Sequence, residues 1–587
     1  MARSLRRLLP VLAVLGVALL LAGDVVRSRL ERESFHDWDH HVAYLEAAAA
    51  SVRRHHELPL WNPYPCGGTP LLGNPQARLL TPFFLLYLVL PPAFALKWDI
   101  ALHFLLAVLG MVVLVREQRG PLAAALVGAL VFGGSTFFSL HLAEGHTWIL
   151  SAAYAPFVLA FYERGLDRRA WAGLAGAFLA LMVGEAGIYP APHLALFLGL
   201  YAAVLALTRR SLQPLLRAGL VYLVAALLAA PKVLPMLAFM RHQPRHIDSE
   251  EVLPLRAILH ALTDRHQALD RSFDWPYWPW HEQGSYVGLL ALLLAGVALL
   301  TAERRSLVLG GLAVLFGSLA AGAFAPWAPW ALLHELPVFR SHHVPSRFLV
   351  MVVLAVAVLA ARGTDVLLSW CPSSRLRTGL ATLLVLLVGA DVLSARAGIL
   401  GPLRCPMARW PQGAPVGEPL VTMRWAPAIA ACGASSGLAP AVRAGVAIIE
   451  AYEPLCPRER VGLVGRLPGL TGVDEPGYRG EAWLEGSGQV EIAARTQHTL
   501  TLRVSPDASG VVILNQNWDE GWRSDGGRLF QDANARLALS LEPHPRTYTL
   551  RYRPPFFLLS VALCLMGLLL LGVLWRRERP RGIPTPP

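Results

Sequence analysis

Residues 98–140 read WDIALHFLLAVLGMVVLVREQRGPLAAALVGALVFGGSTFFSL and contain two long apolar runs, 98–115 and 121–140. The connector between these runs carries Arg116 and Arg119. A membrane-spanning helix needs about 20 mostly apolar residues, and short cytoplasmic connectors are enriched in Lys and Arg. We therefore predict that this stretch forms a helical hairpin that crosses a membrane twice, with its connector in the cytoplasm.

The same signal recurs along most of the chain. Hydrophobic residues make up 55% of the sequence and charged residues only 16%, whereas a soluble domain carries about 25% charged residues. Ten further runs are long and apolar enough to span a membrane: 5–22, 147–163, 170–187, 191–207, 215–239, 286–302, 306–324, 346–362, 378–396 and 556–575. We therefore predict an all-α polytopic membrane bundle of about 12 transmembrane helices.

The placement of arginines predicts the orientation of this bundle. Arginines cluster at both chain ends and in alternate connectors, whereas the short connections 141–146 and 188–190 contain neither Lys nor Arg. By the positive-inside rule, both termini are cytoplasmic and the arginine-poor connections face outward. This pattern requires that run 79–96 does not cross, and its three prolines suit an interfacial or re-entrant segment. We predict a multi-pass protein of the bacterial inner (plasma) membrane, with a cleaved signal peptide at 5–22 as the less favoured alternative.

The chain divides into three parts. Residues 1–396 form the transmembrane module, which includes a large external loop, 23–97. Residues 397–555 form an extracytoplasmic domain that is β-rich from about residue 480, and 556–587 form a C-terminal anchor with a basic tail. Alternating or apolar segments separated by turn residues predict a small antiparallel sandwich, with strands at 490–495, 498–505, 510–516, 535–541 and 547–553.

Net charge and cysteines narrow the class of protein. The formal net charge of +12 comes from basic residues at the ends of apolar runs, and no zinc finger or nucleic-acid motif accompanies it. We therefore expect membrane lipid as a partner and no nucleic acid. Cys66, Cys405, Cys432 and Cys456 fall in segments that we place outside the cytoplasm, where a disulfide can form, but their spacing does not define the pair.

Two short acidic motifs in outward segments are candidates for chemistry. The first, HDWDHH at 36–41, contains Asp37 and Asp39, which would share one face only in an extended chain. Together they would hold a divalent cation such as Mg²⁺ or Mn²⁺, or one would act as a general base, with Trp38 facing a sugar. The second, HLAEGH at 141–146, adds Glu144 and His146. A solvated loop and a polar turn are the structural alternatives.

Further outward segments carry candidate ligands for a substrate. The irregular stretch 59–78 is rich in Pro and Gly, and such a loop is usually functional or disordered. Arginines are usually depleted in outward loops, so those found in these segments need an explanation. Contact with a phosphate group explains them well. The candidate binding residues are Trp61, Asn62, Gln76, Arg78, Glu185, Tyr189, Arg340, His342, His343 and Arg347. Each of these segments also has a structural alternative. The 59–78 loop would cover the bundle as a plug, and the arginines would extend to lipid headgroups. The aromatic stretch 272–280 would form an interfacial aromatic belt.

Taken together, these motifs resemble a known group of membrane proteins. The segments that carry this resemblance are the first-loop acid, PLWNPYPCGGTPLLGNPQARLLTP at 59–82, FRSHHVPSRF at 339–348, and the terminal NWDEGWRSDGG and YTLRYRPPF. With these segments, the sequence resembles the YfhO-like family of bacterial membrane proteins. That family belongs by resemblance to the GT-C superfamily of glycosyltransferases. The resemblance implies a polyprenyl-phosphate sugar donor, Asp37 or Asp39 as the first-loop catalytic acid, Glu144 as a second acid, and a juxtamembrane helix at 79–96.

The combined expectation is an inverting glycosyltransferase. Asp39 or Asp37 would take the proton of an acceptor hydroxyl, and Arg340 or Arg347 would stabilise the departing phosphate. The acceptor would be an envelope glycan, lipid or protein. Two alternatives stay open: a transporter or flippase for a polyprenyl-linked glycan, and a non-catalytic membrane protein that binds envelope glycan.

Overall fold

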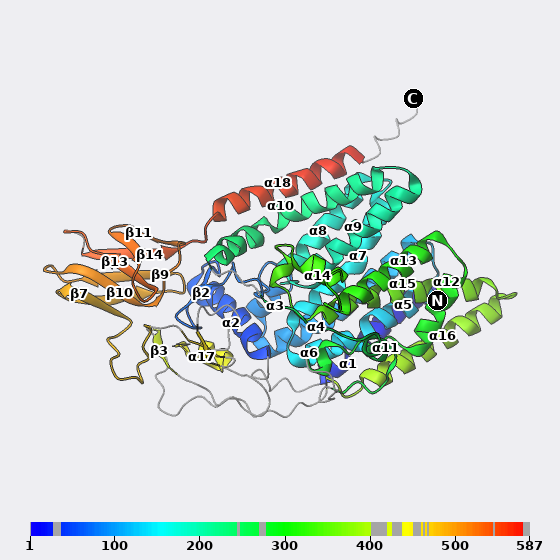
Figure 1. Ribbon diagram of the computed structural model, residues 1–587, viewed down its shortest axis with the longest axis horizontal. Coiled ribbons are helices and arrows are strands. Elements are labelled where there is room, and N and C mark those ends of the chain that lie inside the picture. The colour runs from blue at the N-terminus through cyan, green and yellow to red at the C-terminus, as the bar shows by residue number, and fades with distance from the viewer. Residues whose placement is uncertain are drawn as a thin grey trace.

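The computed structural model shows a helical bundle with a β-sandwich at one end (Figure 1). The description that follows covers residues 2–27, 37–242, 247–268, 278–400, 420–424, 437–449, 459–461, 464–466, 469–543 and 546–578. The predicted aromatic stretch 272–280 lies outside these residues up to position 277, and so do Cys405, Cys432 and Cys456.

All twelve predicted runs are helical. Among the described residues, eight helical segments are long and apolar enough to cross a membrane: Leu8–Arg27 of α1 (Ala2–Arg27), α4 (Pro92–Glu117), Leu122–Glu144, α9 (Pro190–Arg209), α10 (Gln213–His242), Pro345–Ser369, α16 (Ser374–Arg396) and α18 (Phe557–Glu578). Two shorter apolar helices are α8 (Arg169–Gly184) and α12 (Leu289–Leu300). The chain is therefore a mostly helical protein of the multi-pass membrane type, while the count of twelve spans stays a prediction.

Several predicted spans are built from two pieces. Run 121–140 becomes α5 (Leu122–Gly134) and α6 (Thr136–Glu144), which are separated at Ser135. Run 147–163 becomes the 3-10 helix η1 (Thr147–Tyr154) followed by α7 (Ala155–Gly165). Run 346–362 becomes η4 (Pro345–Phe348) followed by α15 (Leu349–Ser369), and run 306–324 corresponds to α13 (Arg304–Ala320).

The predicted external loop 23–97 contains more helix than the sequence indicated. Helix α2 (Trp38–His55) begins directly at the acidic motif, and the predicted non-spanning segment 79–96 contains the short α3 (Phe84–Val89) and the first residues of α4. An α-helix rises about 1.5 Å per residue, so α3 is far too short to cross a membrane. Chain direction changes at Pro91, and α4 starts at Pro92.

The C-terminal β region forms two antiparallel four-stranded sheets. One sheet has the order β12-β13-β10-β7 and the other β11-β14-β9-β8. The strands are β7 (Ala482–Ser487), β8 (Val490–Arg495), β9 (Thr499–Val504), β10 (Ser509–Asn517), β11 (Trp522–Ser524), β12 (Arg528–Gln531), β13 (Arg536–Ser540) and β14 (Thr547–Tyr552). Five of them coincide with the predicted strands, whereas β7, β11 and β12 were not predicted.

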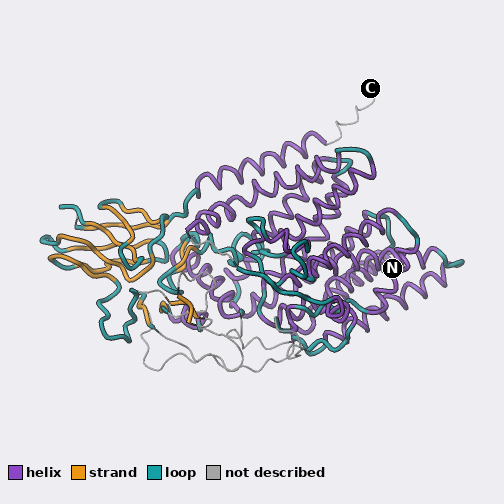
Figure 2. The backbone as a smooth tube through the Cα atoms, viewed as in Figure 1, coloured by secondary structure: helices purple, strands orange, loops and turns teal. Residues whose placement is uncertain are grey.

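The sandwich is anchored to the predicted external loop 23–97. Trp61 is 1% exposed, and its ring centroid lies 4.7 Å from that of Tyr552 and 5.4 Å from that of Trp522. The Asn517 side-chain amide donates to the carbonyls of Cys66 and Gly68, at 2.7 Å each. Figure 2 shows that the strands of the sandwich gather at one end of the molecule, and α18 runs from there along α10.

Candidate active site at the sandwich end of the bundle

The acidic motif is held at the start of α2, between the sandwich and the bundle (Figure 1). Asp37 occupies the N-cap position, and its backbone N–H donates to the carbonyl of Glu144 at 3.1 Å. Gly145 ends α6 with φ +91°, and a Cβ there would lie 2.3 Å from the backbone nitrogen of Trp38. Only glycine accepts both this φ and this approach without strain, so the two predicted acidic motifs lie in direct backbone contact.

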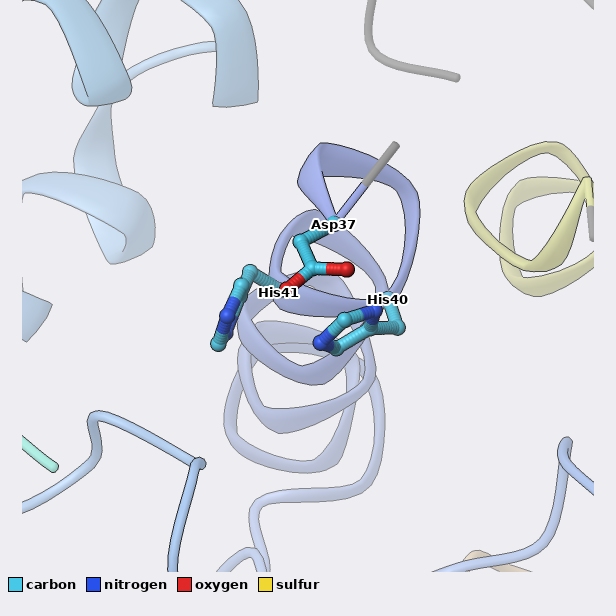
Figure 3. Close-up of side chains that lie close together, drawn as sticks. All are labelled: Asp37, His40 and His41. Atoms are coloured by element: carbon cyan, nitrogen blue, oxygen red, sulfur yellow. The ribbon is translucent and has the colours of Figure 1, made fainter. Parts of the chain in front are cut away.

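Asp37 shares one face of α2 with two histidines. Positions i, i+3 and i+4 of a helix are neighbours, and Figure 3 shows the Asp37 carboxylate between the rings of His40 and His41. One potential ligand atom from each of these three residues lies within 4.8 Å of the others. Burial lowers the pKa of both imidazoles, that of His41 well below its ordinary value, so both rings are neutral at pH 7.

Asp39 points to a different partner. Its two carboxylate oxygens accept the backbone N–H groups of Leu438 and Ala439 at 2.8 and 3.0 Å, at the start of α17 (Leu438–Ala444). The motif is helical rather than extended, and residues two apart on a helix do not face each other. The structure therefore does not bring Asp37 and Asp39 together, and Asp39 contributes to packing of the C-terminal domain segment.

His146 connects the motif of α2 to a second buried cluster. Its Nε2 lies 3.3 Å from Oδ2 of Asp37, and its Nδ1 lies 2.8 Å from Nδ1 of His141. His141, His146 and Glu282 also place their potential ligand atoms within 4.8 Å of one another. Glu282 is the last residue of the short η2 turn (Trp280–Glu282).

Arg347 closes the cluster from the start of the η4–α15 segment. Its Nε donates to Oε2 of Glu282 at 2.8 Å, and its Nη2 contacts Oε1 of the same carboxylate. Burial alone would raise the pKa of Glu282, but the Arg347 guanidinium holds it well below its ordinary value. The guanidinium carbon also lies 4.3 Å from the ring centroid of Tyr189 and 5.0 Å from that of Trp148, so aromatic faces fix its orientation.

The other acids and histidines of the predicted set border the same region. Oε1 of Glu144 lies 3.3 Å from Nδ1 of His281, and the indole N–H of Trp38 donates to the carbonyl of Ala143 at 3.4 Å. His343 lies with its Nδ1 3.2 Å from the Tyr189 hydroxyl. The ring of His342 lies 4.7 Å from that of Tyr189, centroid to centroid. Five chain segments thus meet at this end of the bundle.

Arg340 does not take part in this cluster. Its side chain is about half exposed and pairs with Glu335 at 2.7 Å. Arg340 and Arg347 were predicted as equivalent candidates for phosphate binding. In the structure, Arg347 belongs to the cluster around Asp37 and His146, whereas Arg340 lies in the preceding η3 turn (Phe339–Ser341), with six residues between the two arginines.

Arg78 and Glu185 lie in a separate, fully buried ionic network. Arg78 pairs with Asp99 at 3.0 Å and with Glu185 at 2.7 Å, and the hydroxyl of Tyr87 donates to Asp99 at 2.9 Å. His103 lies 3.0 Å from Asp99 and 3.3 Å from Glu185. This network fastens the 59–78 loop to α4 and to the end of α8, so both Arg78 and Glu185 have protein partners rather than an open ligand site.

The remaining candidates of the first loop are also internal. Asn62 is fully buried, and its Oδ1 accepts the backbone N–H of Tyr64 at 3.2 Å. Gln76 is 9% exposed, its backbone N–H donates to Oδ1 of Asn74 at 2.8 Å, and its side chain lies within hydrogen-bonding reach of His40. Together with Trp61, Asn62 supports the loop, whereas Gln76 lies beside the histidines of α2.

Four residues of the site were missed in the sequence. His40 and His41 lie within the first quoted motif but were not singled out as binding residues. His281 and Glu282 follow the aromatic stretch 272–280. An acid next to a histidine in a predicted outward loop is the signal that could have identified them. In the ionic network, Asp99 and His103 were missed, although ionisable residues within an apolar run indicate a special role.

Comparisons with known proteins add one partial likeness. No family model and no curated protein matches the chain. A solved structure, the single-particle cryo-EM structure of the arabinofuranosyltransferase AftD from Mycobacteria, is similar with 20% sequence identity and a TM-score of 0.43. The likeness covers 68% of this chain, and this chain spans 27% of that protein. At this level the similarity does not define an activity.

Proposed function

We propose that this protein is a glycosyltransferase that takes a sugar from a polyprenyl-phosphate carrier at the outer face of the bacterial inner membrane. One observation carries the proposal: Asp37, Glu144, His146 and the Glu282–Arg347 pair converge on one end of the bundle, from segments far apart in the chain. The arginine pattern supports a location of this end outside the cytoplasm. The motif resemblance to YfhO-like proteins and the GT-C superfamily supports the same class of reaction.

The proposed reaction uses Asp37 as the base. Its side chain is 22% exposed, whereas those of Glu144 and Glu282 are 5% and 3% exposed, so Asp37 is the carboxylate that an acceptor hydroxyl reaches most easily. Asp37 takes the hydroxyl proton, the acceptor oxygen bonds to the anomeric carbon with inversion, and the sugar–phosphate bond breaks. Polyprenyl phosphate leaves as the product, and an envelope glycan, lipid or protein gains the sugar.

Arg347 is the cation proposed to stabilise the leaving phosphate. Glu282 binds Nε and Nη2 of Arg347, so Nη1 takes no part in these two hydrogen bonds. The Tyr189 and Trp148 rings hold the guanidinium plane. A preorganised cation in a site of low dielectric stabilises charge that develops in the transition state. Glu282 in this proposal is a positioning residue for Arg347.

Release of polyprenyl phosphate tests the proposal. The full-length chain would be reconstituted in liposomes with a panel of synthetic polyprenyl-phosphoryl sugars and an envelope extract as acceptor, and the released phosphate lipid quantified by mass spectrometry. We expect release from at least one donor and a loss of about 100-fold or more in Asp37→Asn, since general base catalysis contributes typically 10²–10⁴-fold. Translocation of intact donor without release would instead indicate a flippase.

A further inference from the structure

The first turn of α2 presents three potential metal ligands on one face. Asp37, His40 and His41 stand at i, i+3 and i+4, and their ligand atoms lie within 4.8 Å of one another. The two imidazole centroids are 4.3 Å apart, and both rings flank the carboxylate in Figure 3. Because all three side chains come from one helical turn, small rotations of their side chains bring the ligand atoms closer without any change in the fold.

His41 supplies a second observation. Its side chain is 2% exposed, and neither of its ring nitrogens has a hydrogen-bond partner among the described residues. Buried side-chain polar atoms are nearly always hydrogen-bonded in folded proteins, and an exception calls for an explanation such as an ion. The position of the ring beside a carboxylate and a second imidazole provides that explanation.

The chemistry of the ligand set selects the metal. Two imidazole nitrogens and one carboxylate oxygen form a typical zinc donor set, whereas Mg²⁺ prefers a shell of oxygen ligands. We propose that Asp37, His40 and His41 bind a zinc ion at the start of α2. This assignment replaces the pair Asp37 and Asp39 as the expected cation site, since both oxygens of Asp39 accept backbone N–H groups of α17.

His146 lies next to the position of a fourth ligand of the proposed zinc ion. Its Nε2 lies 3.3 Å from Oδ2 of Asp37, close to the roughly 3.3–3.6 Å that separates neighbouring ligands in a tetrahedral site with bonds of about 2.0–2.2 Å. Its other nitrogen is held by His141 at 2.8 Å, and an outer hydrogen bond of this kind orients a ligating imidazole. A carboxylate can bind a metal through one oxygen, so Asp37 keeps the second oxygen for an acceptor.

This inference goes beyond the proposed transferase and does not depend on it, because its test reads metal content rather than activity. The full-length chain would be purified through a tag without histidine, stripped with a chelator, reloaded with zinc and dialysed. Inductively coupled plasma mass spectrometry would then give the zinc content of wild type, His40→Gln, His41→Gln and Asp37→Asn. His56→Asn is the matched control, because this exposed histidine ends the same helix in the left-handed conformation that Asn accepts.

The expected result is about one zinc ion per wild-type chain and per His56→Asn chain, as for a single site, with at least about 10-fold weaker zinc binding in the other three variants. A wild-type chain that retains no zinc after dialysis would overturn the proposal. Equal zinc content in wild type and a correctly folded His41→Gln would do the same. If that variant misfolds, X-ray absorption of the zinc-loaded wild type decides, since two imidazole ligands are expected and none would contradict the site.

Discussion

Replacement of Arg78 distinguishes a structural role from a ligand-binding role. In the structure, three of its nitrogens contact two carboxylates: Nη1 lies 3.0 Å from Oδ2 of Asp99, and Nε and Nη2 lie 2.8 and 2.7 Å from Oε2 of Glu185. All three side chains are at most 2% exposed. Arg78→Met would remove the guanidinium from between the two buried carboxylates and leave the His103 imidazole and the hydroxyls of Tyr87 and Thr81 as their partners.

The expected cost follows from the burial of this network. Removal of one partner of a buried ion pair costs about 3–5 kcal/mol, because the other charge stays buried without compensation. The double variant Arg78→Met/Glu185→Gln loses one negative charge along with the positive one. We therefore expect its loss of unfolding free energy to be smaller than the sum of the losses in the two single variants by roughly 0.5–3 kcal/mol. Arg340→Met is the control, because an exposed pair contributes at most about 1 kcal/mol.

The assay is denaturant or thermal unfolding of the detergent-solubilised full-length chain, followed by loss of the monodisperse peak in size-exclusion chromatography. We expect Arg78→Met to unfold well before wild type and Arg340→Met to unfold with it. Wild-type stability of Arg78→Met, combined with weaker binding of a polyprenyl-phosphate lipid, would refute the structural assignment and restore the interpretation of Arg78 as a phosphate ligand. Strict additivity in the double variant would show that the two groups are not coupled.

Three further predictions concern the site and its supports. Gly145→Ala should lower stability by more than about 1 kcal/mol, since its φ of +91° excludes Ala, and its Cβ would meet the backbone of Trp38; the same unfolding assay checks this. Trp61→Ala should cost about 3–5 kcal/mol as a large-to-small core change and should expose the sandwich to limited proteolysis, whereas unchanged digestion would contradict the anchoring role of Trp61. Arg347→Lys should lower kcat of sugar transfer with less effect on KM, because Lys cannot form the bidentate contact with Glu282; unchanged kcat would exclude Arg347 from the transition state.

Much of the fold was predictable because membrane helices and alternating strands leave strong local signals. Long apolar runs located the long helices of the bundle, and the prolines near residues 91–92 separated α3 from α4. Helix α2 was missed because its sequence is amphipathic rather than apolar and because His36–His41 was considered as an extended motif. Strands β7, β11 and β12 were missed because they are short or broken by Gly and Ser residues.

The site was predictable only in part, since its contacts are long-range. Sequence position predicted that Asp37, Glu144, His146 and Arg347 lie on one side of the membrane, and in the structure they lie at one end of the bundle. It did not separate Asp37 from Asp39, because the partner of Asp39 lies about 400 residues away in α17. Arg78 and Arg340 carry the same charge as Arg347, but burial against Asp99 and exposure beside Glu335 give them different roles.

A paired measurement on Asp37 and Asp39 tests the central claim most directly. Both residues are aspartates of one helical turn, and Asn is nearly isosteric with Asp, so Asp37→Asn and Asp39→Asn remove the same charge two positions apart. With polyprenyl phosphate release as the readout, we predict that Asp37→Asn abolishes transfer while remaining folded, and that folded Asp39→Asn retains a rate near that of wild type. Wild-type release by Asp37→Asn, with loss only in Asp39→Asn, would contradict the assignment of the cluster around His146 as the reacting centre.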